Sequence, residues 1–273
     1  MTPRTSVLGG EKTQMTKRIA ILGTGNVAWH LQLALENAGH AITEIYGRNL
    51  SHAEKLVRNS YEAEATDSLD FSQSQAEIFL MALTDDSVTE VAQELVLPDG
   101  AILAHTSGTL SIKSIAYAAT EDIGVFYPLQ TLTAGKAINF AEVPICIEGE
   151  TLRAQNELAQ LAQSLSKRVQ MLESGQRRLI HLAAVFACNF TNHLFTLSKG
   201  ILEQHELDFE ILQPLIAETL NKSLEIGPEN AQTGPAIRGD MATLDKQMVA
   251  LENDQAVAEI YRILSQHIID YHS

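Results

Sequence analysis

One stretch near the N-terminus constrains the fold more than any other, because a short apolar segment runs directly into the pattern Gly23-x-Gly25-x-x-Ala28. The first glycine permits a tight turn, the second lets backbone N–H groups approach a pyrophosphate, and the small Ala28 lets a helix pack closely on the strand. A helical pattern then runs to Gly39, and a second strand is expected at Ile42–Tyr46. This spacing is that of one βαβ unit. It predicts a dinucleotide-binding, Rossmann-like domain.

The end of the second expected strand decides which nicotinamide cofactor fits. An NAD site places an acidic side chain there to bind the ribose 2′-hydroxyl, whereas an NADP site needs a cation and room for a phosphate. Here Arg48 follows the small Gly47, and Asn49 or Ser51 can donate to a phosphate. Glu44 is the rival feature, but it precedes the strand end. We expect NADP, with NAD as the less favoured alternative; an ordinary solvated role for Arg48 also fits.

Beyond this unit, apolar strand-like runs alternate with helical segments, a pattern typical of a mainly parallel sheet with helices on both faces. The expected strands are Glu77–Leu83, Ala101–His105, Gly124–Tyr127, Pro144–Glu148 and Arg168–Leu172. From Ser174 onward only helical patterns follow. The sequence therefore predicts an α/β fold, with a Rossmann-like domain at residues 16–173 and an all-helical substrate and dimerisation domain at residues 174–273.

Composition narrows the possible partners and location. The 273 residues carry a net charge of −15, which argues against nucleic acid or an anionic membrane as a partner. No apolar run approaches the roughly 20 residues that are needed to span a bilayer. We expect residues 1–15 to be a disordered tail and not a signal peptide. Cys146 and Cys188 fall in an expected strand and helix, so we expect no disulfide framework and a cytoplasmic location. No metal site is expected.

The strands expected at Glu77–Leu83 and Ala101–His105 both end in small or polar side chains. These side chains are expected to face the cofactor, since ligands of open parallel sheets lie beyond the strand carboxyl ends. We also expect Ser107 and the N–H groups near it to anchor a substrate carboxylate. Helix capping and turn formation are the alternative explanation for these polar residues. Besides Arg48, Asn49 and Ser51, the expected cofactor contacts are Gly23, Thr24, Gly25, Asn26, Val27, Ala82, Leu83, Thr84 and His105.

The first helix of the C-terminal half carries polar side chains in apolar surroundings. At about 100° per residue, His181, Cys188, Asn192 and Lys199 fall on one stripe, with Asn189 beside it. Histidine is the side-chain type whose ordinary pKa suits proton transfer near neutrality. One interpretation is a catalytic face, in which His181 is the acid/base and Asn189 or Asn192 orients the substrate. The other is a set of satisfied polar residues at a dimer interface.

Several motifs together resemble a known family. They are GTGNVA at 23–28, the Gly-Arg-Asn at 47–49, HTSGTLSI at 105–112, GVFYPLQTLT at 124–133, HLAAVFACNFTNHL at 181–194 and TGPAIRGD at 233–240. After Thr16 the chain resembles bacterial oxidoreductase-like proteins that pair a Rossmann-like domain with a helical C-terminal domain of unknown function (DUF2520 type). It is more distantly similar to pyrroline-5-carboxylate reductase, the 3-hydroxyisobutyrate dehydrogenase group and F420-dependent NADP reductases. The resemblance implies a 6-phosphogluconate-dehydrogenase-like architecture and an intertwined helical homodimer.

At the expected catalytic position the chain differs from the families that it resembles. In the hydroxyacid dehydrogenases a lysine on the first interdomain helix, with an asparagine one turn later, acts on the substrate oxygen. This chain has His181 near that place, then Val185, with asparagines only at Asn189 and Asn192. Ser107 lies where those enzymes place a substrate-binding serine, with different flanking residues. The departure concerns the alcohol chemistry and leaves the cofactor fold unaffected.

The sequence supports three functional hypotheses. The first is an NADP-dependent oxidoreductase that transfers a hydride between nicotinamide and a small carbonyl or imine substrate. The second is a non-catalytic NADP-binding sensor that acts through its helical domain, and the third is an F420-dependent NADP reductase of the same fold. A small-molecule substrate and a homodimer through the helical domain are expected. The sequence does not name the substrate or assign a role to the Gly234–Asp240 loop.

Overall fold

The computed structural model describes residues 16–273, so the tail expected at residues 1–15 lies outside the described residues. The chain divides into two compact units, the first ending at Phe186 and the second starting at Ala187. This division is later than the boundary expected before Ser174. The reason lies in the first turns of the helix after Ser174, where Arg177 is only 1% exposed and packs against the sheet unit.

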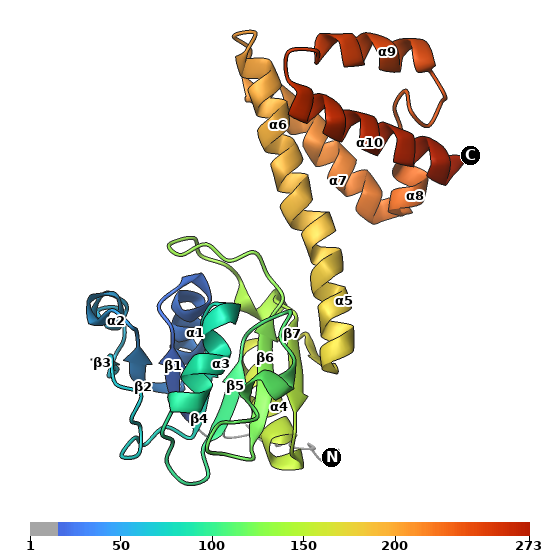
Figure 1. Cartoon of the computed structure of the whole chain (residues 1–273). Helices are drawn as coiled ribbons and strands as arrows, with labels where there is room; N and C mark the ends of the chain where they lie inside the picture. The colour runs from blue at the N-terminus through green and yellow to red at the C-terminus, as the bar shows by residue number, and fades with distance from the viewer. Residues whose placement is uncertain (1–15) are drawn as a thin grey trace, which may run out of the picture. The chain divides into compact units, whose positions relative to one another are not determined.

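The first unit is built on one eight-stranded sheet in the order β3-β2-β1-β4-β5-β6-β7-β8 (Figure 1). Its neighbouring strands are parallel except for the antiparallel pair β6 and β7. The expected mainly parallel sheet is thus confirmed. The strands are β1 (Arg18–Leu22), β2 (Ala41–Tyr46), β3 (Glu64–Thr66), β4 (Ile78–Met81), β5 (Ile102–His105), β6 (Ile123–Pro128), β7 (Ile145–Gly149) and β8 (Val169–Met171).

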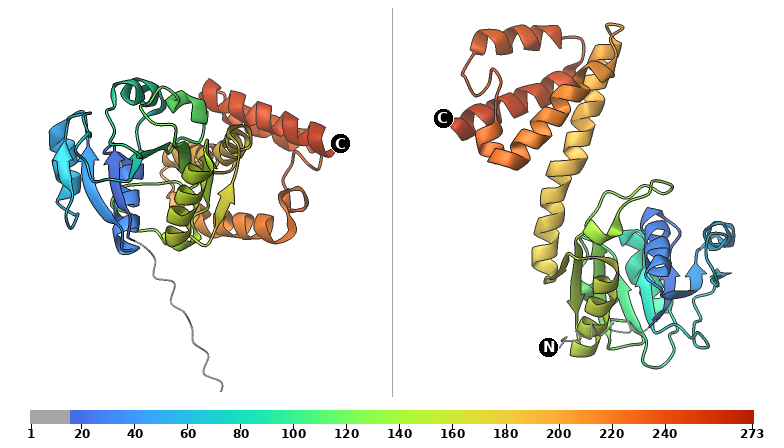
Figure 2. Two further views of the ribbon diagram at one scale, coloured as in Figure 1. Left: turned by 90° about the horizontal axis from the view of Figure 1, so that it is seen from below. Right: turned by 180° about the vertical axis from the view of Figure 1, so that it is seen from behind.

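Helices cover both faces of this sheet, and each face has its own core. Alternate residues of β1 enter opposite cores, with Ile19 and Ile21 on one side and Ala20 and Leu22 on the other. The first core packs against α1, α2 and α4, and the second against α3 and η1, an arrangement visible in Figures 1 and 2. The helices are α1 (Asn26–Asn37), α2 (Leu50–Val57), α3 (Asp85–Glu94), α4 (Leu152–Leu165) and the 3₁₀ turns η1 (Ile112–Ile115) and η2 (Phe140–Glu142).

Two elements of the sheet unit differ from the expectation. The sequence did not indicate β3, which has three residues and therefore too little periodicity to be recognised. The sequence also predicts a helical segment from Ser111 to Ala118. It forms only the short 3₁₀ turn η1, for which the Ser111 side chain accepts a hydrogen bond from the Lys113 backbone N–H.

The second unit is all-helical in its described residues, as expected. Its elements are α6 (Thr191–Glu203), η4 (Phe209–Leu212), α7 (Gln213–Ile226), α8 (Pro228–Ala231), α9 (Met241–Ala250) and α10 (Gln255–His272). Before α6 come α5 (Ser174–Ala184) and the π-helical segment η3 (Val185–Phe190), which makes one helical run from Ser174 to Glu203. The division between the two units falls within this run.

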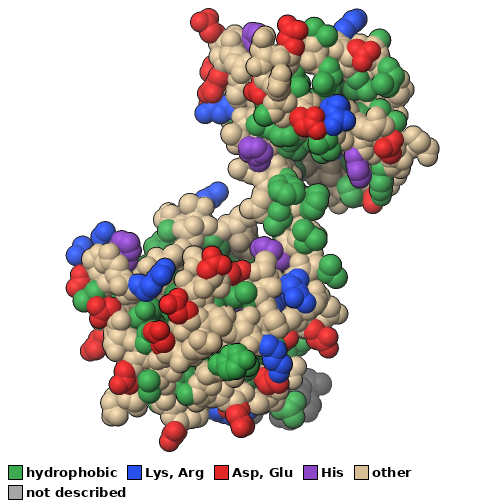
Figure 3. Space-filling model, in the orientation of Figure 1, with side chains coloured by type: hydrophobic (Ala, Val, Ile, Leu, Met, Phe, Trp, Pro, Cys, Tyr) green, Lys and Arg blue, Asp and Glu red, His purple; other side chains and the backbone are tan. Residues whose placement is uncertain are grey.

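The helical unit buries very little apolar surface in one chain. Among the described residues after Phe186, Ala236 and Leu244 are the only buried apolar side chains. Large exposed ones include Ile211 at 71%, Leu215 at 63% and Leu224 at 87%, and hydrophobic side chains are visible on the surface of this unit in Figure 3. A folded helical unit normally buries its apolar stripe, so these faces need a covering that one chain does not supply within the unit.

The helical run Ser174–Glu203 is also long and apolar enough, by length and composition alone, to cross a membrane. One window of 18 residues reaches a mean hydropathy of 1.2, and none of that window is buried. The expectation that no segment reaches such a length is therefore wrong by these two criteria. The sequence reading counted uninterrupted apolar residues, whereas the window tolerates the polar residues spaced along this helix.

Candidate functional site

The turn between β1 and α1 has a backbone that requires glycine. Gly23 has a φ of +128°, and its N–H donates to the Tyr46 carbonyl at 2.8 Å. A β-carbon at Gly23 would overlap the carbonyl oxygen of Ala82, which belongs to the segment after β4. A β-carbon at Gly25, by contrast, would meet no atom within 4 Å. The turn is therefore packed tightly on the side of the sheet and open at the N-terminus of α1, as a pyrophosphate requires.

A cavity of about 370 Å³ opens beside this turn. Three strand ends line it, namely those of β1, β2 and β4, so it lies at the carboxyl edge of the sheet, where ligands of such folds bind. The lining residues are Gly23, Thr24, Gly25, Gly47, Arg48, Asn49, His52, Ala82, Leu83, Thr84 and Ser87. Most of the expected cofactor residues are thus brought together. The cavity suits a dinucleotide, with room at Gly25 for phosphates and a cation at Arg48.

The segment after β2 forms the basic end of the cavity. Arg48 is exposed there, while the Asn49 side chain caps α2 by accepting from the Ser51 backbone N–H at 3.0 Å and from the Ser51 hydroxyl at 2.8 Å. Ser51 is thereby turned to Asn49 and does not line the cavity. His52 does line it, one turn along α2, and the sequence reading missed it. Glu44 lies before the last residue of β2 and is not part of the lining.

Asn26 and Val27 have other partners. The Asn26 side-chain oxygen accepts from the Ala134 backbone N–H at 3.1 Å, and one turn later His30 contacts the Thr133 carbonyl oxygen at 3.0 Å. Val27 packs against the first core. The loop after β6 is therefore docked on α1, the helix of the fingerprint turn.

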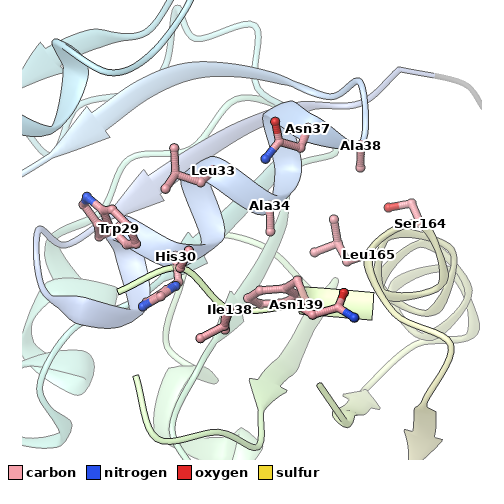
Figure 4. A pocket seen from close by; sticks show the side chains of 12 residues that line it. Trp29, His30, Leu33, Ala34, Asn37, Ala38, Ile138, Asn139, Ser164 and Leu165 are labelled. Carbon is pink, nitrogen blue, oxygen red and sulfur yellow. The ribbon is translucent and has the colours of Figure 1, made fainter. Parts of the chain in front are cut away.

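A second cavity, also of about 370 Å³, lies on the other side of α1, between that helix, the loop before η2 and the end of α4 (Figure 4). Trp29, Leu33, Ile138, Phe140 and Leu165 give it a largely apolar lining, and no Lys, Arg, Asp or Glu contributes to it. None of the site residues expected from the sequence lines this cavity. The expected cofactor residues thus gather at the cavity beside the fingerprint turn and not at this second cavity.

The segment after β5 is a compact polar turn. The Ser107 hydroxyl oxygen accepts from the backbone N–H groups of Thr109 and Leu110, each at 3.0 Å. The Thr109 hydroxyl donates to the Asp85 carboxylate at the start of α3. Ser107 therefore closes its own turn, as the capping explanation proposed, while its hydroxyl remains half-buried at the carboxyl edge of the sheet.

Beside this turn, Tyr127 and His181 form a hydrogen-bonded pair. The Tyr127 hydroxyl, at the end of β6, lies 2.9 Å from Nδ1 of His181 on α5. Both rings crowd Gly108, since a β-carbon there would lie 2.6 Å from His181 Nδ1 and 2.8 Å from Tyr127 Cζ. Burial, and to a smaller extent the nearby Cys146, raises the pKa of Tyr127 to about 12. The phenol is therefore protonated at neutral pH and can donate to Nδ1; a neutral imidazole that accepts this bond carries its own proton on Nε2.

Sequence reading missed Tyr127, although a signal was available. Gly124–Tyr127 was recognised as a strand of the parallel sheet, and Tyr127 is near its carboxyl end, where site residues gather. What the sequence did not show was that a residue 54 positions later would contact it.

His105 does not line the cavity, because it is completely buried. Its Nδ1 accepts from the Ser107 backbone N–H at 3.2 Å, and its Nε2 lies 3.3 Å from the Ser111 carbonyl oxygen. Burial, and next the positive charge of Arg177, lowers the pKa of His105 to about 4. The residue is therefore a neutral support of the Ser107 turn.

The two asparagines expected to orient the substrate belong to the helical unit. Asn189 lies in η3 and Asn192 in α6, and both side chains are exposed. Of the rest of the predicted stripe, Cys188 is a free, exposed thiol and Lys199 pairs with Glu203 at 3.4 Å. His181 belongs to the first unit. The candidate site residues on the described first unit are thus the cavity lining, the Ser107 turn and the Tyr127–His181 pair.

The fold and the fingerprint turn define a Rossmann-like dinucleotide-binding protein with a helical second unit. Family models agree: residues 3–126 match a Rossmann-like domain, and residues 143–268 match a domain of unknown function, DUF2520. The chain is 35% identical to a "putative NADP oxidoreductase" from Bacteroides fragilis, with a TM-score of 0.86 and coverage of 93% of this chain and 98% of that one. The chain belongs to this family, which joins a Rossmann-like domain to a DUF2520 domain.

More distant structures share the fold. A reductive aminase from Aspergillus terreus, solved with NADPH and ethyl-5-oxohexanoate, is 14% identical, with a TM-score of 0.71 and coverage of 93% of each chain. An imine reductase from Streptomyces aurantiacus is 12% identical, with a TM-score of 0.67 and coverage of 94% of this chain and 95% of that one. Comparison with curated protein sequences gives no match.

The lowered pKa of His105 predicts a specific loss of stability in acid. Between pH 6.5 and about 4 the unfolded chain binds a proton on this histidine that the folded chain does not, so the free energy of unfolding falls as the pH falls. Across this pH window the protonation of His105 lowers the free energy of unfolding by about 3 kcal/mol. Urea unfolding of the parent and of His105→Asn at pH 7, 5.5 and 4 measures it, and the gap between the two proteins should narrow toward pH 4. His193→Asn, at an exposed position, is the control; a constant gap for His105→Asn contradicts the assignment.

Proposed function

We propose that the protein is an NADP-dependent oxidoreductase that transfers a hydride between nicotinamide and a small carbonyl or imine substrate. The observation that carries the proposal is the placement of a proton-donating pair, Tyr127 and His181, at the carboxyl edge of the same sheet as the dinucleotide cavity. Ligands of this fold lie across that edge. The related proteins named above, among them the "putative NADP oxidoreductase" from Bacteroides fragilis, support the same class of reaction.

NADP is the cofactor that the cavity fits. Its phosphates would lie at the N-terminus of α1, where Gly25 leaves open space, and its 2′-phosphate would meet Arg48. No acidic side chain is part of the cavity lining, so the usual acceptor for the 2′-hydroxyl of NAD is not provided there.

Bound NADPH supplies the hydride, and the chain's own residues handle the proton and the geometry. During reduction of a carbonyl or imine, His181 would donate the proton on Nε2 to the oxygen or nitrogen, and Nδ1 would take up the Tyr127 hydroxyl proton. A proton from solvent would then restore the Tyr127 hydroxyl, because burial disfavours the phenolate. Ser107 and the turn that it closes fix the other end of the substrate. Asn189 and Asn192 remain the candidates for orienting the reacting atom.

We further propose a homodimer through the helical unit, in the cytoplasm. The supporting observation is the pair Ala236 and Leu244, the only buried apolar side chains among the described residues of that unit. A second copy offers the same apolar faces, so one symmetric contact can cover both. The free thiols Cys146 and Cys188 agree with a reducing compartment.

Arg48→Ala should weaken NADP binding by about ten to a hundredfold and leave NAD binding unchanged, because only NADP carries the phosphate that Arg48 contacts. Calorimetric titration with both cofactors measures this. Arg58→Ala, at an exposed arginine just after α2, is the matched control. Equal affinity of the parent for NAD and NADP would contradict the cofactor assignment.

His181→Ala should lower kcat by a factor of about 10² to 10⁴ on any carbonyl or imine that the parent reduces, with unchanged NADPH affinity. Tyr127→Phe keeps the ring and removes only the hydroxyl, so it should lower kcat while the protein stays folded. His193→Ala is the control, and turnover is followed by NADPH absorbance. Unchanged kcat in a folded His181→Ala protein removes His181 from the mechanism, and tight NADPH binding without turnover on the whole panel supports a non-catalytic sensor.

Light scattering at micromolar concentration should show a dimer for the full chain. Ile211→Glu with Leu215→Glu places charges on the exposed apolar face of the helical unit and should yield monomers, whereas Leu152→Glu, at an exposed leucine of α4, should leave the dimer intact. A monomeric parent would refute the dimer. A parent that stays in solution only with detergent would point instead to membrane contact by the helix Ser174–Glu203.

A further inference from the structure

Behind the Tyr127–His181 pair lies a buried arginine that the proposed chemistry does not use. Arg177 on α5 is 1% exposed and forms an ion pair with Glu148 of β7. Its NH2 group donates to the Leu110 carbonyl and lies 3.3 Å from the Ser174 hydroxyl. Its Nε is buried and has no hydrogen-bond partner among the described residues. Burying a guanidinium in this way is costly, and such pairs add little net stability.

Glu148 and Ser174 extend the contacts of Arg177 into a network. The Ser174 hydroxyl donates to the Glu148 carboxylate, 2.7 Å from Oε2 and 3.0 Å from Oε1, and it accepts from the Ile112 backbone N–H at 3.1 Å. One carboxylate and one guanidinium thereby connect β7, the start of α5 and the chain between β5 and η1. All of these residues belong to the first unit.

The network fixes both parts of the proton-donating site. Leu110, whose carbonyl Arg177 holds, is the residue whose N–H donates to the Ser107 hydroxyl, so the guanidinium pins the far end of the Ser107 turn. Arg177 also precedes His181 by four residues, one turn along the same face of α5. Between these two points Gly108 lies against both His181 and Tyr127 with no room for a side chain.

We propose that Arg177, held by Glu148, is a positioning residue that sets the register between the Ser107 turn and the helix face bearing His181, and so maintains the hydrogen bond from Tyr127 to His181 Nδ1. The role of Tyr127 and His181 in proton transfer rests on the proposed function, whereas the hydrogen bond between them does not. A planar guanidinium can hold two acceptors in fixed directions, which an ammonium group cannot. Arginine is therefore specifically required.

The test uses the full chain and two variants. Removing Arg177 alone would leave the Glu148 carboxylate buried without its partner, so the first variant replaces both residues, Arg177→Met with Glu148→Met, and should stay folded. The second, Arg177→Lys, keeps the charge but loses the fixed fork. The matched control is Lys17→Met with Glu157→Met, which removes the partly buried ion pair of 2.6 Å between the chain before β1 and helix α4.

The first readout needs no substrate. Histidine-selective ¹⁵N NMR, with His181 assigned by its loss in His181→Gln, reports which ring nitrogen carries the proton. The parent and the Lys17/Glu157 control should show His181 with the proton on Nε2, and both Arg177 variants should show a mixture of tautomers. On a substrate that the parent turns over, kcat should fall about a hundredfold in both Arg177 variants, as expected for a displacement of about 1 Å, with the NADPH Kd unchanged.

The outcomes separate this inference from the proposed function. If the parent shows no turnover but the His181 tautomer changes in the Arg177 variants, the proposed reaction is contradicted and the positioning role is supported. Folded Arg177 variants with the parent tautomer overturn the positioning role, whatever the activity. Failure of both variants to fold, with the control intact, also overturns it, because Arg177 would then be required for folding and not for register.

Discussion

The cavity beside the fingerprint turn depends on the close approach of three strand ends around Gly23. The Gly23 N–H reaches the Tyr46 carbonyl after β2, and the absent side chain of Gly23 makes room for the Ala82 carbonyl after β4. This contact places the three segments that line the cavity within reach of one ligand. A side chain at Gly23 would require both a strained backbone and a displaced neighbour. Gly25 leaves the positive end of α1 open, which is where we propose that the cofactor phosphates bind.

A second tight approach, at Gly108, organises the other half of the site. His181, Tyr127 and the Ser107 turn meet there from α5, β6 and the segment after β5. Two buried groups hold the Ser107 turn in place beside Gly108. The neutral His105 accepts from the Ser107 N–H, and Arg177, paired with Glu148, donates to the Leu110 carbonyl. His105, which was expected to contact the cofactor, is thus a buried support of the Ser107 turn, whereas His181 lies against Gly108 with Tyr127.

The helical unit differs from the sheet unit in how little of its apolar surface it buries. The sheet unit fills two cores with its own side chains, but among its described residues the helical unit buries only Ala236 and Leu244 of its apolar side chains. Its helices form because their sequence patterns are amphipathic and well capped; the Asp240 and Asp254 side chains cap α9 and α10 by accepting from Thr243 and Val257 N–H groups. Their apolar faces require a partner surface. The partner we propose is a second copy of the chain, since it is apolar in the same places.

The sequence by itself determined the order of strands and helices, the fingerprint turn and the class of ligand. Local patterns control these features: Gly23 and Gly25 have fixed spacing, and Arg48 follows a strand end whose position the periodicity gives. The sequence alone did not predict β3, the burial of His105 or the contacts of Tyr127 and Arg177. Those depend on which segments, distant in the chain, meet across the sheet, such as Tyr127 with His181 and Glu148 with Arg177. Only tertiary packing decides such meetings, because a residue's neighbours in space set its exposure and its hydrogen-bond partners.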